Sequence, residues 1–180
     1  MNYKIDHANT RQPDVQRVNQ IATRVYWDQE KKTITDGQGG THDIFEAKFI
    51  EVETTITDRV AIARQELLKE ICDYDQSTAV NEFFLNGDSM WIPREVREAL
   101  MRRFEAEKSA ERTTTNINQM GRVYTLPIDT AISIMNQLEV YAADCYDCTQ
   151  AHLGAAAALN TFEAIVAYDY TTGYPQKLAF

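Results

Sequence analysis

The chain of 180 residues carries 27 acidic against 18 basic side chains, which gives a formal charge of −9. That charge argues against binding to nucleic acid and to anionic membranes, because both attract a basic face. The hydrophobic share of 44% excludes wholesale disorder, and the length suits one full domain with a smaller appendage, or two small domains. No apolar run approaches the roughly 18 residues that span a bilayer, and the polar start lacks the apolar core of a secretory signal, so a cytoplasmic location is the default expectation.

The N-terminal part is expected to hold little regular structure apart from a small sheet. Residues 1–22 contain Pro13 and few large apolar groups, which predicts a loosely ordered arm, or an arm that needs a partner, with at most a helical turn over residues 18–25. The glycine-rich residues 36–40 predict a loop. The strand candidates are residues 25–27, 33–35 and 44–52. An antiparallel sheet of two or three strands is therefore predicted.

A first helix is predicted after this sheet. Thr57 or Asp58 can cap its N-terminus, and the helix is expected to run to about Cys72 before residues 72–77 break it. Its apolar residues recur at helical spacing with charges on the opposite face. These residues are Val60, Ala63 or Arg64, Leu67 and Ile71.

A β-hairpin is predicted around Asn86 and Gly87, the pair of residues that type I′ turns favour. The β-prone segments that flank this pair are residues 80–85 and 89–92. Pro93 suits the first turn of a second helix, over residues 93–108, because the N–H group that proline lacks has no helical partner at that position.

A second strand pair is predicted around Met120 and Gly121, and the longest element follows it. A helix that begins at Pro127 or Asp129 meets no internal proline before its end near Leu159, a span of about 46 Å at about 1.5 Å per residue. About four heptads of a/d spacing favour a coiled-coil or helical-bundle partner, although the small and polar residues among them equally favour packing on other helices of the fold. The a/d residues are Ile128, Ala131, Met135, Leu138, Ala142, Cys145, Thr149, His152, Ala156 and Leu159.

Thr161 can cap one more short helix over residues 162–168, and the tyrosine-rich residues 168–175 are interpreted as a lid that folds back on the long helix. The predicted fold class is α+β. A small N-terminal antiparallel β appendage, residues 1–55, is followed by a mainly helical domain with two β-hairpins and one long helix, residues 56–180.

Cys145, Cys148 and His152 share one face of the long helix and pose a choice between a metal site, a redox pair and core packing. Zinc takes such ligands, with Cys72 as a possible fourth, but three ligands on one straight helix converge poorly on one ion. Thiols in mid-helix beside two aspartates are disfavoured as thiolates, which argues against redox chemistry. Packing is therefore the preferred interpretation, and neither a metal nor another cofactor is predicted.

No catalytic motif is recognised, so the protein is predicted not to be an enzyme. The glycine-rich loop lacks the GK[ST] of a P-loop, and no serine lies in a GxSxG elbow. The acids Asp144, Asp147 and Asp169 are interpreted as solvated charges rather than glycosidase carboxylates. The a/d face of the long helix and the aromatic side chains are instead predicted to supply packing and an interface. The predicted residues are Met135, Leu138, Ala142, Cys145, Thr149, His152, Trp91, Tyr170 and Tyr174.

Several motifs in residues 74–101 and 121–180 carry a resemblance to a known family. They are F-x-L-N-G-x-x-M-W at residues 83–91, Arg97 with Leu100, L-E-x-Y-A at residues 138–142, C-Y-x-x-T-x-x-H at residues 145–152 and Y-D-Y-T-x-G-Y-P at residues 168–175. Together they resemble a domain-of-unknown-function family that recurs in tail-fibre and other virion-associated proteins of bacteriophages, with versions in Bacteroides and crAss-like gut phages. Residues 1–55 show no such match.

The resemblance implies a bacteriophage virion structural module rather than an enzyme, associated with the tail or tail fibre and acting by self-association and protein–protein contacts. A homo-oligomer is expected, with a trimer as the form suited to a fibre, together with contacts to other virion proteins but not to nucleic acid or membrane. The protein would be made in the host cytoplasm and end in the virion. Two alternatives stay open: a head-side decoration or adaptor protein, and a polysaccharide hydrolase of the tail, which requires two carboxylates about 5 to 10 Å apart in a cleft.

Overall fold

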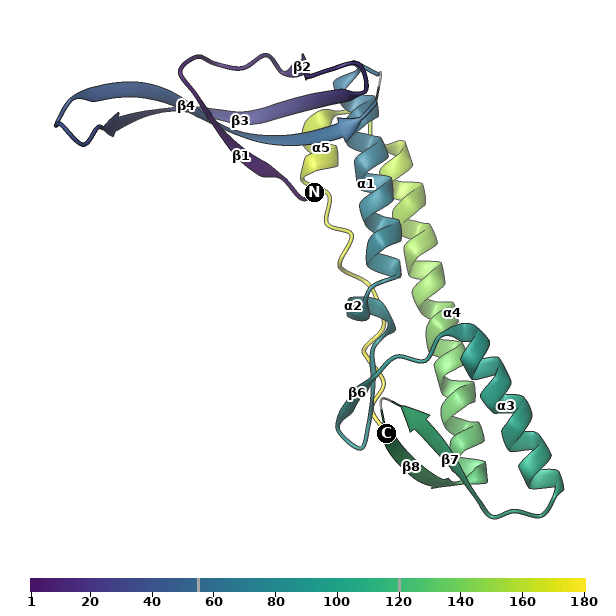
Figure 1. The fold of residues 1–180 in the computed structure, drawn as a ribbon. Coiled ribbons are helices and arrows are strands. Elements are labelled where there is room, and N and C mark those ends of the chain that lie inside the picture. Colours follow the sequence, from purple (N-terminus) through teal and green to yellow (C-terminus); the bar gives the residue numbers. More distant parts are fainter. Residues whose placement is uncertain (55, 120) are drawn as a thin grey trace. The chain divides into compact units, whose positions relative to one another are not determined.

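The computed structural model describes residues 1–54, 56–119 and 121–180, and it combines α and β structure as predicted, with an antiparallel N-terminal sheet and one long helix (Figure 1). The chain divides into two compact units. The sheet unit comprises Met1–Ile71 and Leu153–Tyr170, and the helical unit comprises Cys72–His152 and Thr171–Phe180. These units do not follow the predicted division after residue 55, because each of the two longest helices contributes residues to both. None of the helices in the described part of the chain has the length and apolar character to cross a membrane.

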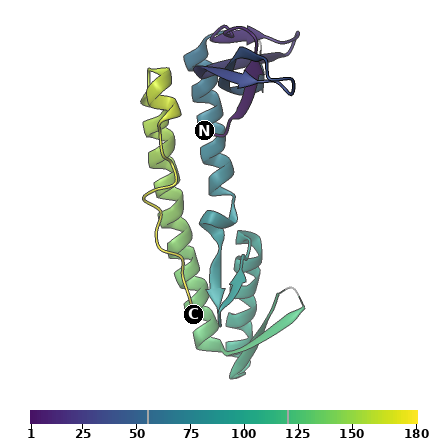
Figure 2. The same cartoon turned by 90° about the vertical axis from the view of Figure 1, so that its left-hand side faces the viewer.

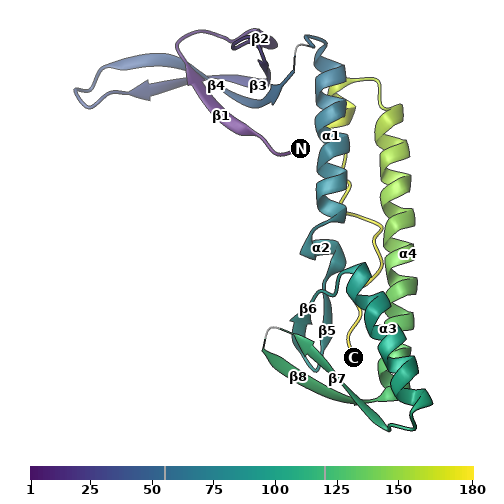
Figure 3. The ribbon, with the colours of Figure 1, turned by 45° about the vertical axis from the view of Figure 1, so that its right-hand side comes forward.

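The sheet unit is built on four antiparallel strands in the order β1-β4-β3-β2 (Figure 3). The strands are β1 (Lys4–Ala8), β2 (Val15–Arg17), β3 (Ala22–Thr35) and β4 (Thr41–Glu53). The prediction of a loose arm or helical turn for residues 1–22 is wrong, and so is the smaller number of strands, because β1 and β2 add to the two edges of the β3–β4 hairpin. Their backbone groups find partners far along the chain, as Lys4 does opposite Phe49, and local composition does not reveal such pairing.

The predicted strand pieces all lie inside this hairpin, and the predicted loop over residues 36–40 is the turn that joins β3 to β4. Asp36 shapes the turn, since its carboxylate accepts hydrogen bonds from the backbone N–H groups of Gln38 and Gly40 at 2.9 and 2.8 Å. Short acidic side chains favour turns by such local bonds. The three predicted segments belong to two long strands because β3 and β4 satisfy each other's backbone hydrogen bonds along the hairpin.

The main core of the sheet unit contains side chains from the sheet and from three helices: α1 (Arg59–Asp75), α5 (Phe162–Val166) and the C-terminal end of α4 (Ile128–Ala158), which contributes Ala156. Trp27 meets Phe162 edge-on, with ring centroids 5.7 Å apart, and Leu67 is fully buried beside them. Asp58 caps α1 as predicted by accepting from the N–H groups of Val60 and Ala61.

Both α1 and α5 differ from the prediction at their C-terminal ends. α1 continues to Asp75, past the predicted end at Cys72, and the chain turns only at Gln76 and Ser77. α5 begins after its predicted cap, Thr161, but ends earlier than predicted, at Val166. Helix ends are the least determined by sequence because fraying and the last turn depend on tertiary contacts.

The helical unit holds two β-hairpins and most of its residues in helices. Its elements are α2 (Thr78–Asn81), β5 (Phe83–Leu85), β6 (Asp88–Met90), α3 (Arg94–Ser109), β7 (Thr114–Gln119), β8 (Arg122–Pro127) and, up to His152, α4 (Ile128–Ala158). Asn86 and Gly87 have φ values of 52° and 82°, as the predicted type I′ turn requires. The predicted strand over residues 80–85 begins only at Phe83, because Ser77 caps α2 by accepting from the N–H of Ala79.

The second predicted strand pair is confirmed as the β7–β8 hairpin. Met120, one half of the predicted turn pair, lies outside the described residues. Gly121 has a φ of 78°, a conformation that glycine adopts without a Cβ clash. Pro93 was expected in the first turn of this helix. It is instead the N-cap residue, and α3 begins at the next residue, Arg94.

α4 is the predicted long helix, and it begins and ends within one or two residues of the predicted limits. In the helical unit its a/d face is covered by the chain itself: Met135 and Leu138 share a core with Phe83 of β5 and Phe104 of α3. The buried residues of this face therefore pack within one chain, and self-association through the face stays a prediction. The a/d spacing predicts burial, and within one chain most of these positions are buried, while Ala142 and His152 are partly exposed.

Candidate functional site

Residues 171–180, here called the strap, run back along α4 within the helical unit (Figure 2). Tyr174 anchors the strap: its hydroxyl lies 2.9 Å from Oγ1 of the buried Thr149, which donates to Oδ1 of Asp75 at 2.8 Å. Because Thr149 gives its one proton to the carboxylate, Tyr174 is the donor to Thr149. Burial raises the pKa of Tyr174, which keeps this donor protonated. The predicted lid is thus observed at Tyr174.

His152 and Cys148 hold the backbone of the strap. Nε2 of His152 lies 2.8 Å from the carbonyl oxygen of Thr172, so this nitrogen carries a proton and donates it. Sγ of Cys148 lies 3.7 Å from the same carbonyl oxygen. The imidazole also stacks on Tyr174, with ring centroids 5.8 Å apart. Two of the three residues considered as metal ligands therefore face one carbonyl group of the strap.

Cys145 lies in a separate small core cluster with Val80 and Tyr141. Tyr141 donates to the carbonyl oxygen of Val80 at 2.7 Å, and burial raises the pKa of the Cys145 thiol. Cys72, considered as a fourth ligand, is exposed. Within residues 1–54, 56–119 and 121–180 no group of three or more His, Cys, Asp or Glu side chains is arranged to hold a metal ion. The surroundings of Cys145 are those of a packing residue.

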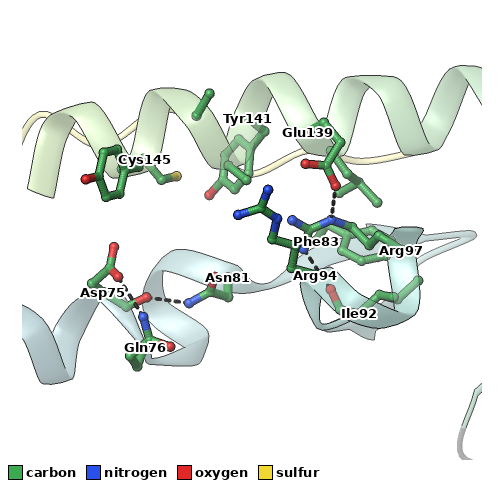
Figure 4. Close-up of a pocket in the computed structure, with 14 residues that line it drawn as sticks. Asp75, Gln76, Asn81, Phe83, Ile92, Arg94, Arg97, Glu139, Tyr141 and Cys145 are labelled. Atoms are coloured by element: carbon green, nitrogen blue, oxygen red, sulfur yellow. Dashed lines mark hydrogen bonds and ion pairs between the residues drawn. The ribbon is translucent and has the colours of Figure 1, made fainter. Parts of the chain in front are cut away.

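The helical unit also contains a cavity of about 610 Å³ beside α4 (Figure 4). Arg97 links its walls, because Nε donates to Glu139 at 2.7 Å and Nη1 donates to the carbonyl oxygen of Ile92 at 2.8 Å. The second carboxylate in the lining, that of Asp75, accepts from Thr149. Both carboxylates are thus engaged by the protein's own donors.

A different candidate lies in the sheet unit, at the far end of the β3–β4 hairpin (Figure 3). β1 pairs with β4 only as far as Phe45, and β2 pairs with β3 only as far as Val25. Residues 30–43, here called the ribbon, form two strands and a turn, and every one of them is exposed. In the described part of the chain no third strand pairs with the ribbon. The sequence predicted a loop over residues 36–40 and a short strand over residues 33–35. It did not predict that β3 and β4 extend beyond the strands that flank them.

Ion pairs cross the hairpin within the ribbon and just beyond it. Nζ of Lys31 lies 2.6 Å from the carboxylate of Asp43, and Nζ of Lys32 lies 2.5 Å from that of Glu46. These lysine hydrogen bonds lower the pKa of Asp43 and of Glu46. Ile34 leaves 39% of its surface exposed among these charges. Charges of both signs on a strand edge discourage indiscriminate pairing with other strands.

The nine residues predicted for packing or interface fall into three groups. The buried ones are Met135, Leu138, Cys145 and Thr149, the partly exposed ones are Ala142, His152, Tyr170 and Tyr174, and the exposed one is Trp91. Tyr170 belongs to the sheet unit, where its hydroxyl donates to Glu70 at 3.4 Å. The structure therefore does not bring the nine together on one surface.

Comparisons with known proteins return no relative: no protein-family model, no curated protein and no solved structure matches the chain.

Proposed function

We propose that this chain is a structural module of a bacteriophage virion, associated with the tail or tail fibre, and that it acts by self-association and by contacts with other virion proteins. The motifs in residues 74–101 and 121–180 support the virion assignment by their resemblance. The ribbon supports the mode of action. The resemblance and the ribbon would equally support the alternative, a head-side decoration or adaptor protein.

The ribbon carries this proposal because it gains little from its own contacts. Two strands without a covering layer are marginally stable in water, and each open edge presents unpaired backbone N–H and C=O groups. All side chains of residues 30–43 are exposed, so the segment adds nothing to the core. A strand or groove of a neighbouring subunit would complete the hydrogen bonding of one edge.

Native mass spectrometry and light scattering of the full chain over a range of concentrations test self-association, and a homo-oligomer, a trimer for a fibre part, is expected. The test variant joins Lys31 to Phe45 through Asn-Gly and so removes residues 32–44. Lys31 and Phe45 are opposite each other in the hairpin, so a two-residue turn closes it without changing the remaining register. This variant is expected to be monomeric with unchanged thermal unfolding.

Ile34→Val is the matched control, because it keeps the ribbon and its apolar side chain. A wild-type chain that stays monomeric at every concentration would overturn self-association. A shortened chain that assembles like the wild type would remove the ribbon from the interface.

The location is tested on purified particles of a phage that carries this sequence. Tails are separated from heads on a gradient, and the copy number of the protein in each fraction is measured by quantitative mass spectrometry. A fixed copy number in the tail fraction is expected. The same result in the head fraction would favour the adaptor alternative, and absence from both fractions would overturn the virion assignment.

A further inference from the structure

The cavity beside α4 has the size of a ligand site. Its volume of about 610 Å³ lies within the range of about 300–1,000 Å³ that is typical of pockets for small ligands. All of its lining residues belong to the helical unit. The part of α4 that lines it, from Leu138 to Tyr146, spans about 12 Å at about 1.5 Å per residue. An extended tripeptide, about 10 Å long, can therefore lie along this wall.

Two guanidinium groups present hydrogen-bond donors at one end of the cavity (Figure 4). Arg97 uses Nε for Glu139 and Nη1 for the carbonyl of Ile92, and in the described part of the chain its Nη2 makes no hydrogen bond. Arg94 donates through Nε to Glu98 at 3.2 Å, and among the described residues its two Nη groups make no hydrogen bond either. Since guanidinium donors match the two oxygens of a carboxylate, this end is suited to a carboxylate.

The opposite end of the cavity presents hydrogen-bond acceptors instead (Figure 4). The carboxylate of Asp75 accepts one hydrogen bond at each oxygen, from Thr149 at 2.8 Å and from Gln76 at 2.7 Å. A carboxylate has about four acceptor sites, so about two are left. The side-chain amides of Gln76 and Asn81 donate through their NH₂ groups, while within the described residues their carbonyl oxygens accept no hydrogen bond. This end is suited to an ammonium group, which carries three donors.

We propose that the cavity binds a short peptide with both termini free, its carboxylate at Arg94 and Arg97 and its ammonium group at Asp75. The unused donors and the unused acceptors lie at opposite ends, and this separation complements a molecule with one charge of each sign at its two ends. Between the ends, Leu138 and Ala142 of α4 give the wall an apolar surface for the middle of the peptide. The site involves neither the ribbon nor self-association, so it goes beyond the proposed function.

Isothermal titration calorimetry of the full wild-type chain with the probe tripeptide Ala-Leu-Ala tests the site. The tripeptide with free termini should bind about tenfold more tightly than its C-terminally amidated form, and about tenfold more tightly than its N-acetylated form, because each modification removes one charge-assisted contact. Equal affinities for the three peptides, or no binding at millimolar concentration, would overturn the proposal. So would a loss confined to one modification, because the ligand would then need only one charge.

Two variants assign the ends of the peptide. Arg94→Gln changes a largely exposed side chain and should reduce the effect of amidation but not that of acetylation. Asp75→Asn keeps an oxygen that can accept from Thr149, and it should reduce the effect of acetylation only. The matched control is Arg102→Gln, an exposed arginine of α3 outside the cavity lining, which should change neither effect. Because each variant is compared with itself across the peptides, partial unfolding cannot produce this pattern. Variants that weaken all three peptides equally would contradict the assigned ends.

The chain without residues 32–44 separates this site from the proposed function. Those residues belong to the sheet unit, so this variant should bind the three peptides as the wild type does, whether or not it still assembles. Peptide binding that disappears together with the ribbon would overturn the placement of the site in the helical unit. Wild-type binding by a chain that never self-associates would leave the peptide site standing and remove only the proposed mode of action.

Discussion

The a/d face of α4 and the ribbon differ in exposure. Most side chains of the α4 face are buried within one chain, whereas every residue of the ribbon is exposed. The α4 face has the regular spacing of an interface, yet Met135 and Leu138 are 1% and 5% exposed within one chain. The ribbon has short, charged strands around Ile34, and in the described part of the chain no further strand pairs with either of its edges. Apolar spacing indicates that a face is covered but not which chain covers it, whereas an unpaired strand edge leaves backbone N–H and C=O groups open to a further strand.

A charge placed on the α4 face should have the largest effect on stability. Leu138→Asp buries an unpaired carboxylate in the core of the helical unit, and we expect the free energy of unfolding to fall by about 3–5 kcal/mol. Urea unfolding followed by circular dichroism measures the change. Val140→Asp is the control, since this neighbouring side chain is 63% exposed, and it should leave the unfolding midpoint almost unchanged. Equal midpoints for the two variants would show that the face is not a core.

The polar contact between the α4 face and the strap should have a smaller effect. Thr149→Val removes the partner of both Asp75 and Tyr174, and a loss of about 1–3 kcal/mol is expected, against about 1 kcal/mol for Tyr174→Phe. The double variant should lose less than the sum, because both changes remove the same hydrogen bond. Strictly additive losses in urea unfolding would contradict that bond.

The helical unit should lose stability in alkaline solution. Burial raises the pKa of the Cys145 thiol in the folded protein, while in the unfolded chain a thiol ionises near roughly pH 8.5. Above that pH the folded state binds more protons than the unfolded state, so the free energy of unfolding falls as pH rises. The raised pKa values of Tyr141 and Tyr174 extend the fall to higher pH.

Urea midpoints between about pH 7 and 10 measure this slope, which begins near the pKa of an unfolded thiol. Cys145→Ala should flatten the part of the slope that starts there, whereas Cys72→Ala, at an exposed position, should not. Stability that rises with pH over this range would have the wrong sign for a buried thiol.

The smallest effect on stability is expected on the ribbon. Ile34→Asp changes an exposed side chain that supports no core, so its unfolding midpoint should match that of the wild type. If the ribbon docks on a partner, the same variant should weaken assembly in light scattering. A clear loss of stability in Ile34→Asp without a loss of assembly would show that the ribbon contributes to the fold and not to an interface.

Part of the candidate site was visible in the sequence. The spacing of Cys145, Cys148 and His152 predicts one helix face, and the tyrosines at the end of the chain predict a lid. The sequence does not show that His152 and Cys148 meet the carbonyl of Thr172, or that the strap joins β5. These contacts involve backbone groups, which every residue carries, so side-chain patterns hold no information about them.

The sequence by itself determined the elements that close over a few residues: the cap at Asp58, the turn at Asn86 and Gly87, and both ends of α4. Capping bonds, positive φ values and helical periodicity act between near neighbours and need no knowledge of the rest of the chain. Only the tertiary structure decided that residues 1–22 supply two strands, that the α4 face is covered from within, and that the ribbon stays uncovered. Each of those outcomes depends on which distant segment offers the better hydrogen bonds and packing, and that competition is settled by the whole fold.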